Sequence, residues 1–328
     1  MAPMRRVLAL VTMLVGCGDG EGSDPDAMPM VDANRNLLSE SGLYSDFASR
    51  TIAPEYREYT PAYELWADGA SKRRFLYLPP GTTIDVSSAD HWSFPPGTRV
   101  FKEFSVGNVV VETRLIEKRD ADSFRFQVFV WRQDGSDADL TTSGAVDVRG
   151  TTHDVPTQSQ CLTCHLGEPG RFLGLSTVQL SPPSTFLATL SGANLLSAPV
   201  APVTIPGDAT TRAAMGVLHA NCGHCHNPEG TAYGQVNMIL RVTVAETAGA
   251  ADQTQLWMTT VNQKTTSYMT PAFYRIAGTM AGISGIPVRM GMDKRGILNE
   301  QMPPIASETE DTSGRNLVLA WIATLPAP

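Results

Sequence analysis

Two short motifs carry the side chains that are best suited to chemistry in this sequence. They are CLTCH, residues 161–165, and CGHCH, residues 222–226. In each, two cysteines stand three positions apart and a histidine follows the second, which is the attachment signature of c-type haem. The thiols bond covalently to the porphyrin and the imidazole binds the iron. We therefore predict two covalently bound haem c groups, attached through Cys161, Cys164, His165, Cys222, Cys225 and His226.

Two other uses of paired cysteines explain the motifs less well. In zinc sites built from two such pairs, about 15–20 residues usually separate the pairs, whereas here residues 165–221 lie between them. Zinc also gives no reason for a histidine directly after both pairs. A redox disulfide is typical of a thioredoxin-like βαβ context, which the surrounding sequence lacks.

The second motif is followed by a candidate sixth ligand of its iron. Met302 stands in a proline-rich loop, QMPP, shortly before an amphipathic terminal segment over residues 313–326. The order of haem motif, Met-Pro loop and closing helix resembles the class I cytochrome c module, so Met302 is predicted to bind the iron opposite His226. The alternative is a methionine that fills a gap in the core. Arg289 is predicted to pair with a haem propionate, with a solvated arginine as the alternative. The other candidate methionine ligands are Met280, Met290 and Met292.

The first motif has no comparable partner before the second motif begins. His153, just upstream in THDVPTQSQC, is the candidate sixth ligand of the first iron. Met215 and His219 lie on the segment that leads into the second motif, where a core methionine and a packed or solvated histidine are the simpler interpretations. An iron with His165 as its only axial ligand is the remaining alternative.

The N-terminal residues predict export. Residues 1–16 combine Arg5 and Arg6 with the apolar run VLALVTMLV, which is typical of a secretory signal peptide. The run ends in LVGC, which resembles a lipobox, so Cys17 is predicted to be acylated; a plain signal peptide with a chance cysteine is the alternative. Residues 17–42, rich in Gly, Asp and Pro, are predicted to form a disordered tether. The predicted location is the periplasm, with a lipid anchor in the outer membrane, and the formal net charge of −8 argues against a nucleic-acid partner.

Residues 43–156 predict a β-rich, sandwich-like domain. Short apolar or alternating runs are separated by turn signals such as Pro-Pro-Gly, and this spacing favours a sandwich or barrel over βαβ units. The predicted strands lie within 74–85, 94–104, 108–117 and 124–131. Alternation places Val109, Val111, Thr113 and Leu115 on one face of the third, and Phe124, Phe126, Val128 and Val130 on one side of the fourth. Trp66, Trp92 and Trp131 are predicted to be core residues, with an aromatic carbohydrate-binding platform as the alternative.

Residues 157–328 predict a mostly α, cytochrome c-like domain that carries both haems, with a second haem module at 208–328. Apolar residues recur at helical spacing over 210–222 and over 313–326. Ser313 is the predicted N-cap of the second of these helices. The sequence between them is rich in Gly, Pro and Ser, which predicts short helices in long loops. The predicted fold is therefore multidomain, with a mostly β part followed by a mostly α part.

Segments over most of the chain resemble a known family. Before the haem motifs they are YELWADGASKRRFLYLPPGTTID, WSFPPGTRVFKEFS, VETRLIEK and VFVWRQDGSDADL; at and after the motifs they are QCLTCH, FLGLSTVQL, LHANCGHCHNPEG, QMPP and WIATLP. Over residues 60–326 the chain is similar to a family of uncharacterised, exported dihaem c-type cytochromes of Gram-negative bacteria. The resemblance implies haem c binding, electron transport and an envelope location. It does not imply the sixth ligand of the first haem.

Together these features favour an electron-transfer protein over an enzyme. Two tethered haems can pass electrons between redox partner proteins of the envelope, with the potentials set by axial ligands and burial. The alternative is a peroxidase-like or oxygen-using haem enzyme with an open first iron. Glu168 and Arg171 are its nearest acid–base candidates, and we interpret them as surface charges. A third hypothesis makes the β-rich domain a binding module for a partner protein or an envelope polymer.

Overall fold

The computed structural model describes residues 36–266, 273–297, 300–305 and 307–328. The predicted signal peptide, the predicted lipidation site Cys17 and most of the predicted tether lie outside these residues. The strands are β1 Tyr44–Asp46, β2 Thr51–Ile52, β3 Arg57–Glu58, β4 Ser71–Tyr77, β5 Arg99–Val106, β6 Val109–Lys118, β7 Phe124–Trp131 and β8 Ala138–Thr141. The α-helices are α1 Gln158–His165, α2 Thr177–Leu180, α3 Phe186–Gly192, α4 Ala209–Asn221, α5 Tyr233–Val236, α6 Gln255–Thr260, α7 Gly285–Met290 and α8 Thr312–Thr324. No helix within the described ranges has both the length and the apolar composition needed to cross a membrane.

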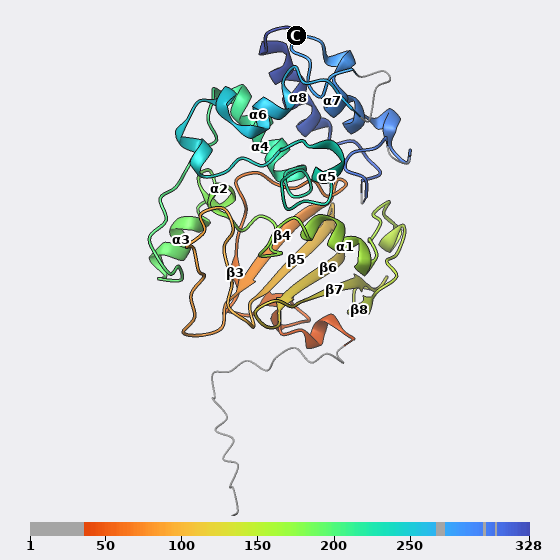
Figure 1. Ribbon diagram of the computed structural model, residues 1–328. Coiled ribbons are helices and arrows are strands. Elements are labelled where there is room, and N and C mark those ends of the chain that lie inside the picture. The colour runs from red at the N-terminus through yellow and green to blue at the C-terminus, as the bar shows by residue number, and fades with distance from the viewer. Residues whose placement is uncertain (1–35, 267–272, 298–299, 306) are drawn as a thin grey trace, which may run out of the picture.

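Strands β3 to β8 form one six-stranded antiparallel sheet in which each strand pairs with the next along the chain (Figure 1). The two Pro-Pro-Gly segments turn at Gly81 and Gly97, whose φ angles of 73° and 86° are conformations that glycine adopts without strain. β1 and β2 pair only with each other and are two or three residues long. The predicted sandwich is therefore wrong, because these two short strands cannot form a second sheet that covers the first.

One face of the sheet packs against the segment that precedes it in the sequence. Phe75, Phe101 and Leu115 lie side by side in register on β4, β5 and β6, and they are buried in one apolar cluster with Leu38. Burial of each such side chain contributes about 1.5–3 kcal/mol. Because Leu38 is fully buried, folded structure begins inside the range 17–42 for which the sequence predicts a tether.

The opposite face of the sheet changes character along its length. The apolar core at one end includes Leu76, Val100, Ile116, Trp92 and Phe172. Two residues away from Leu76, Val100 and Ile116, the same three strands carry Arg74, Lys102 and Arg114, which are again paired in register. Helix α1 lies over this face and contacts β7 (Figure 1). The charged part of the sheet therefore faces the interior of the molecule.

The chain after residue 157 is not mostly helical, so this part of the predicted fold is also wrong. Among the described helices, only α4 and α8 reach 13 residues, and the other six have four to eight. Glycine and proline are frequent between the helices, and both residue types disfavour helix interiors. Loops therefore make up much of this region, as the Gly- and Pro-rich composition predicts.

The two long helices are those that the sequence predicts at 210–222 and 313–326. They pack against each other around a core that includes Met215, Leu218 and Trp321. The start of α8 differs from the prediction, because Asp311 rather than Ser313 caps it and accepts a hydrogen bond from the backbone N–H of Gly314. Of the predicted core tryptophans, Trp92 and Trp131 are buried, whereas Trp66 is half-buried.

Candidate functional site

The first motif occupies helix α1. Thr157 precedes the helix, and its backbone N–H donates to the side chain of Gln160 at 2.8 Å, which fixes the first turn. Cys161 and Cys164 are both half-buried and neither forms a disulfide. Their spacing on one helix places the two sulfur atoms on neighbouring turns of the same side, as the haem attachment chemistry requires.

The imidazole of His165 is held by the loop that follows α1. Its Nδ1 lies 2.6 Å from the carbonyl oxygen of Arg171, so Nδ1–H donates and Nε2 remains available as a ligand. Burial, together with the charge of Lys102, holds the pKa of His165 well below its ordinary value. The ring is therefore neutral near neutral pH, which is the form that binds iron.

Glu168 and Arg171 stabilise this loop. The interpretation of Glu168 as a surface charge is wrong, whereas Arg171 is half-buried. The Arg171 guanidinium donates to the carbonyl oxygens of His165 and Glu168 at 3.3 and 3.1 Å. The Glu168 carboxylate is largely buried and lies 2.9 Å from Arg241 and 3.2 Å from His91. Both side chains are thus engaged in local structure.

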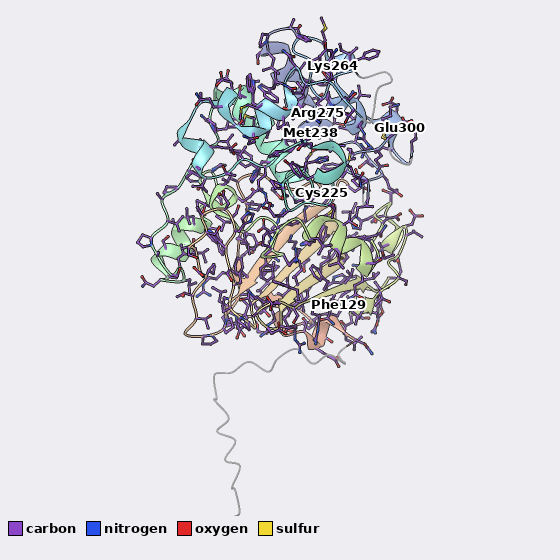
Figure 2. All side chains as sticks on the ribbon, in the orientation of Figure 1. Phe129, Cys225, Met238, Lys264, Arg275 and Glu300 are labelled. Atoms are coloured by element: carbon purple, nitrogen blue, oxygen red, sulfur yellow. The ribbon has the colours of Figure 1, made fainter. Side chains whose placement is uncertain are left out.

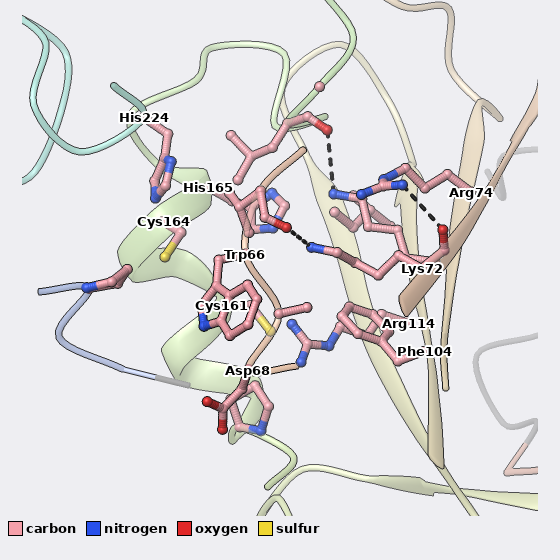
Figure 3. Close-up of a pocket in the computed structure, with 18 of the residues that line it drawn as sticks. Trp66, Asp68, Lys72, Arg74, Phe104, Arg114, Cys161, Cys164, His165 and His224 are labelled. Atoms are coloured by element: carbon pink, nitrogen blue, oxygen red, sulfur yellow. Dashed lines mark hydrogen bonds between the residues drawn. The ribbon is translucent and has the colours of Figure 1, made fainter. Parts of the chain in front are cut away.

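A cavity of about 130 Å³ lies between the first motif and the sheet. Cys161, Cys164 and His165 line it from α1 (Figure 3). Its other walls include Lys72, Arg74, Lys102 and Arg114 of the sheet, Trp66, His153, His224 and Pro303.

His153, the candidate sixth ligand of the first iron, lines the same cavity as His165. It is buried, and its Nε2 lies 2.9 Å from Oε1 of Glu112. Its Nδ1 has no hydrogen-bond partner among the described residues. A carboxylate that holds one ring nitrogen while the other is free is a common arrangement for metal-binding histidines. The environment of His153 therefore suits the predicted role, which stays a prediction.

The second motif follows α4 directly. Its backbone closes in a tight turn, in which the N–H groups of Cys225 and His226 donate to the carbonyl oxygen of Cys222 at 3.1 and 2.9 Å. The Nδ1 atom of His226 is buried and lacks a hydrogen-bond partner within the described ranges. Burial lowers the pKa of His226 to about 4. This ring, like that of His165, is neutral and free to bind a metal.

The segment that carries Met302 is fixed by two arginines. The N–H of Met302 donates to the carbonyl oxygen of Arg289 at 3.0 Å, and Arg295 donates to the carbonyl oxygen of Met302 at 2.7 Å. The charge of Arg289 is near enough to His226 to help lower its pKa, while Pro303 and Ile305 line the cavity beside the first motif. The segment that carries Met302 therefore lies near both motifs. The predicted pairing of Arg289 with a propionate stays a prediction. Among the alternative methionines, Met280 and Met292 are exposed and Met290 is in the core.

The two motifs meet in the folded chain. Sγ of Cys164, a ring nitrogen of His224 and Sγ of Cys225 all lie within 4.8 Å of one another. The Asn227 side chain, fully buried, donates to the carbonyl oxygens of Gly167 and His224 at 3.2 and 3.1 Å and so joins the loop after the first motif to the second motif. A Cβ at Gly167 would lie 1.8 Å from the carbonyl oxygen of His224, so this contact requires glycine.

The position of this contact is between the sheet and the C-terminal helices. Figure 2 shows Cys225 between the sheet, marked by Phe129, and the helical part, marked by Met238 and Arg275. Sequence reasoning missed Asn227 and the contact itself. The only local signal is the Asn directly after the second motif, in CGHCHNPEG, which nothing else in the sequence connects to residue 167.

The residues present fit two covalently attached haems. The fit rests on four free thiols, on two neutral proximal imidazoles, and on the unpartnered ring nitrogens of His153 and His226. The cluster of Cys164, His224 and Cys225 also has the donor set of a zinc site with one open position. A zinc site of this kind would leave Cys161, Cys222, His165 and His226 without a role.

Comparison of the chain with protein-family models, with curated proteins and with solved structures finds no match. Any assignment of function therefore depends on the residues of this chain and on their arrangement.

Proposed function

We propose that this protein is an exported c-type cytochrome that carries two haems and transfers electrons between redox partner proteins of the cell envelope. The observation that carries the proposal is the meeting of the two CxxCH motifs, in which the sulfur atoms of Cys164 and Cys225 lie within 4.8 Å of each other. When bound, haem supplies a one-electron iron couple. Attachment points this close favour the passage of an electron between the two sites inside one chain.

The chain's own residues hold and orient the ligands of the two sites. The carbonyl oxygen of Arg171 fixes the ring of His165, and Glu112 does the same for His153. Asn227 keeps the loop after one motif against the other motif. A fixed ligand set suits electron transfer, because little has to move when the charge of an iron changes.

The proposed location is the periplasmic face of the outer membrane. This location is proposed because the sequence LVGC, which ends at Cys17 and resembles a lipobox, follows two arginines and an apolar run. Attached acyl chains would anchor the protein and leave the haem-binding part free to meet soluble or membrane-bound redox partners. Replacement of Cys17 by serine, followed by membrane fractionation, tests this part of the proposal.

A haem enzyme with an open first iron is the second candidate, and the cavity beside His165 favours it. His153 in the same cavity favours the carrier, because a second imidazole would fill the open position. Carbon monoxide binding distinguishes the enzyme from the carrier. Binding to the reduced protein at one haem, with steady peroxide turnover, would support the enzyme; absence of binding would support the carrier.

The haem count tests the central proposal. Protein matured with a cytochrome c assembly system is expected to have the intact mass of the chain plus two haems. Joint replacement of Cys161 and Cys164 by alanine should leave one haem, as should joint replacement of Cys222 and Cys225. In the two-haem protein, electron paramagnetic resonance should show coupling between the ferric centres that both single-haem variants lack. A wild-type protein that carries zinc, or no haem, would exclude the proposal.

A further inference from the structure

Four basic side chains of the sheet line the cavity beside the first motif. Lys72 and Arg74 come from β4, Lys102 from β5 and Arg114 from β6. Arg74, Lys102 and Arg114 are direct cross-strand neighbours, an arrangement in which like charges repel one another. Figure 3 shows Lys72, Arg74 and Arg114 on the wall opposite Cys161 and Cys164. The sheet thus concentrates positive charge where the protein has an internal space.

The two arginines of this group have carboxylate partners. Arg74 is 2.9 Å from Glu64, and Arg114 makes a two-bonded pair with the buried Glu112. Each of these pairs is locally neutral. The charges of the two arginines are therefore balanced by these carboxylates and do not require a further anion.

The two lysines have only neutral partners. Nζ of Lys72 donates to the carbonyl oxygen of Leu65 and faces the ring of Phe104 at 5.5 Å. Nζ of Lys102 donates to the carbonyl oxygen of Leu173 at 3.4 Å. Within the described ranges, neither ammonium group has a carboxylate at ion-pair distance. A desolvated cation without an anion is unfavourable.

The acidic residues of the cavity wall are engaged elsewhere. Asp68 accepts hydrogen bonds from the backbone N–H and the hydroxyl of Thr309, and Asp154 accepts one from the backbone N–H of Asp147. Burial accordingly lowers the pKa of Lys102 to about 7 and that of Lys72 well below its usual value. Within the described ranges, Lys72 and Lys102 are therefore the basic side chains of the wall that no carboxylate pairs.

We propose that Lys72 and Lys102, flanked by Arg74 and Arg114, form a binding site inside the cavity for two oxyanion groups of the carboxylate type. Two sources can supply this chemistry. One is the pair of propionates of the haem attached at Cys161 and Cys164, and this source rests on the proposed function. The other is a free oxyanion that enters through the mouth of the cavity. With the first source, the sheet serves to hold the first haem.

The test compares wild type with Lys72→Met and Lys102→Met, which remove the charges and keep most of the side-chain volume. Lys118→Met is the matched control, because Lys118 is a buried lysine of the same sheet that does not line the cavity. Lys102→Arg retains the charge and should behave as wild type. Haem content is measured first, then the reduction potentials of both haems and the melting temperature in sulfate and in acetate at constant ionic strength.

If the haem propionates are the bound groups, Lys72→Met and Lys102→Met lower the reduction potential of the first haem and leave that of the second unchanged. Sulfate and acetate then have no saturable effect on the melting temperature. If a free oxyanion is the source, sulfate or acetate raises the melting temperature of wild type saturably, and the rise is lost in both Met variants but kept in Lys118→Met and Lys102→Arg. Protein without haem would refute the proposed function. The effect of sulfate and acetate on the melting temperature would then decide alone whether the oxyanion site exists. Potentials that match those of Lys118→Met, with no anion effect, would overturn the oxyanion site; so would the absence of an anion effect in haem-free protein.

Discussion

The two CxxCH motifs have the same pattern of cysteines and histidine but very different surroundings. The first lies on a helix over a sheet, beside a cavity with basic walls. The second follows α4, and of its residues His224 lines both that cavity and the smaller one next to it. Its Cys222 packs against the aliphatic core between α4 and α8. In the proposed cytochrome, the motif would set the attachment chemistry, whereas the surroundings would set the sixth ligand, solvent access and potential of each haem.

This comparison predicts that a charge change on the sheet will affect only the first site. Glu112 is fully buried and accepts hydrogen bonds from Arg114 at 2.7 and 2.5 Å, while His153 lies 2.9 Å away. Glu112→Gln should lower the free energy of unfolding by about 3–5 kcal/mol, because a buried charge loses its partner. It should also change the spectrum of the first haem and not that of the second.

Glu58→Gln is the matched control for denaturant unfolding. Glu58 makes the same two-bonded contact with Arg73, but both side chains are 49% exposed. Solvent screening should therefore limit its loss to about 1 kcal/mol or less. Equal losses in the two variants would show that the Glu112 pair does not act as a buried unit.

Asn227 should affect both sites together. Its side chain donates to three carbonyl oxygens, those of Gly167, Gly223 and His224. Asn227→Ala should lower the free energy of unfolding by about 2–3 kcal/mol, because each buried carbonyl without a donor costs about 1–3 kcal/mol and water restores part of that. The spectra of both haems should change. Asn316→Ala, an exposed position on α8, is the control, and a change confined to one haem would mean that Asn227 does not couple the sites.

Local features of this molecule could be predicted from its sequence. The attachment residues follow from spacing, and α4 and α8 follow from apolar periodicity, because both signals depend only on near neighbours. Alternation alone fails on β6, where the register with β5 shifts between Phe104 and Ser105. As a result, Val111 packs with Phe104 and Val128, while Leu115 packs with Phe101 on the other face.

Contacts between distant segments could not be predicted. In a strand, basic residues that alternate with apolar ones normally indicate a face in solvent, yet Lys102 and Arg114 face a cavity that exists only once α1 has packed over the sheet. The meeting of the two motifs depends on Gly167 and Asn227, which are 60 residues apart. The sequence therefore predicts the two sites singly and not their contact.

Met302 should affect only the second site. Met302→Ala is expected to abolish the sulfur-to-iron charge-transfer band at the red end of the visible spectrum and to lower the potential of the second haem. The cost in stability should be about 1 kcal/mol, because the side chain is only half-buried. His153→Ala is the counterpart at the first site and should leave this band intact. An unchanged band in Met302→Ala would transfer the ligand assignment to Met290, the buried alternative.

The smallest expected effect concerns the ion pairs that join the two sites. Glu168 follows the first motif, and Arg241, which follows the second, lies 2.9 Å from its carboxylate. A hydrogen bond to Glu168 raises the pKa of His91 above its ordinary value of 6.5, against the opposing effect of burial. The stability that protonated His91 contributes is therefore fully present below the unfolded pKa of about 6.5 and is lost as the pH rises through the folded pKa.

Wild type should accordingly lose up to about 1 kcal/mol of unfolding free energy over that pH range relative to His91→Gln, since the pair is partly exposed to solvent. Denaturant unfolding at a series of pH values measures the difference, and added salt should reduce it. Because His91 and Arg241 act on the same carboxylate, the pH dependence should become larger in Arg241→Met, where the histidine is the remaining cation beside Glu168. Parallel stability curves for wild type and His91→Gln would show that Arg241 alone makes the link between the two sites.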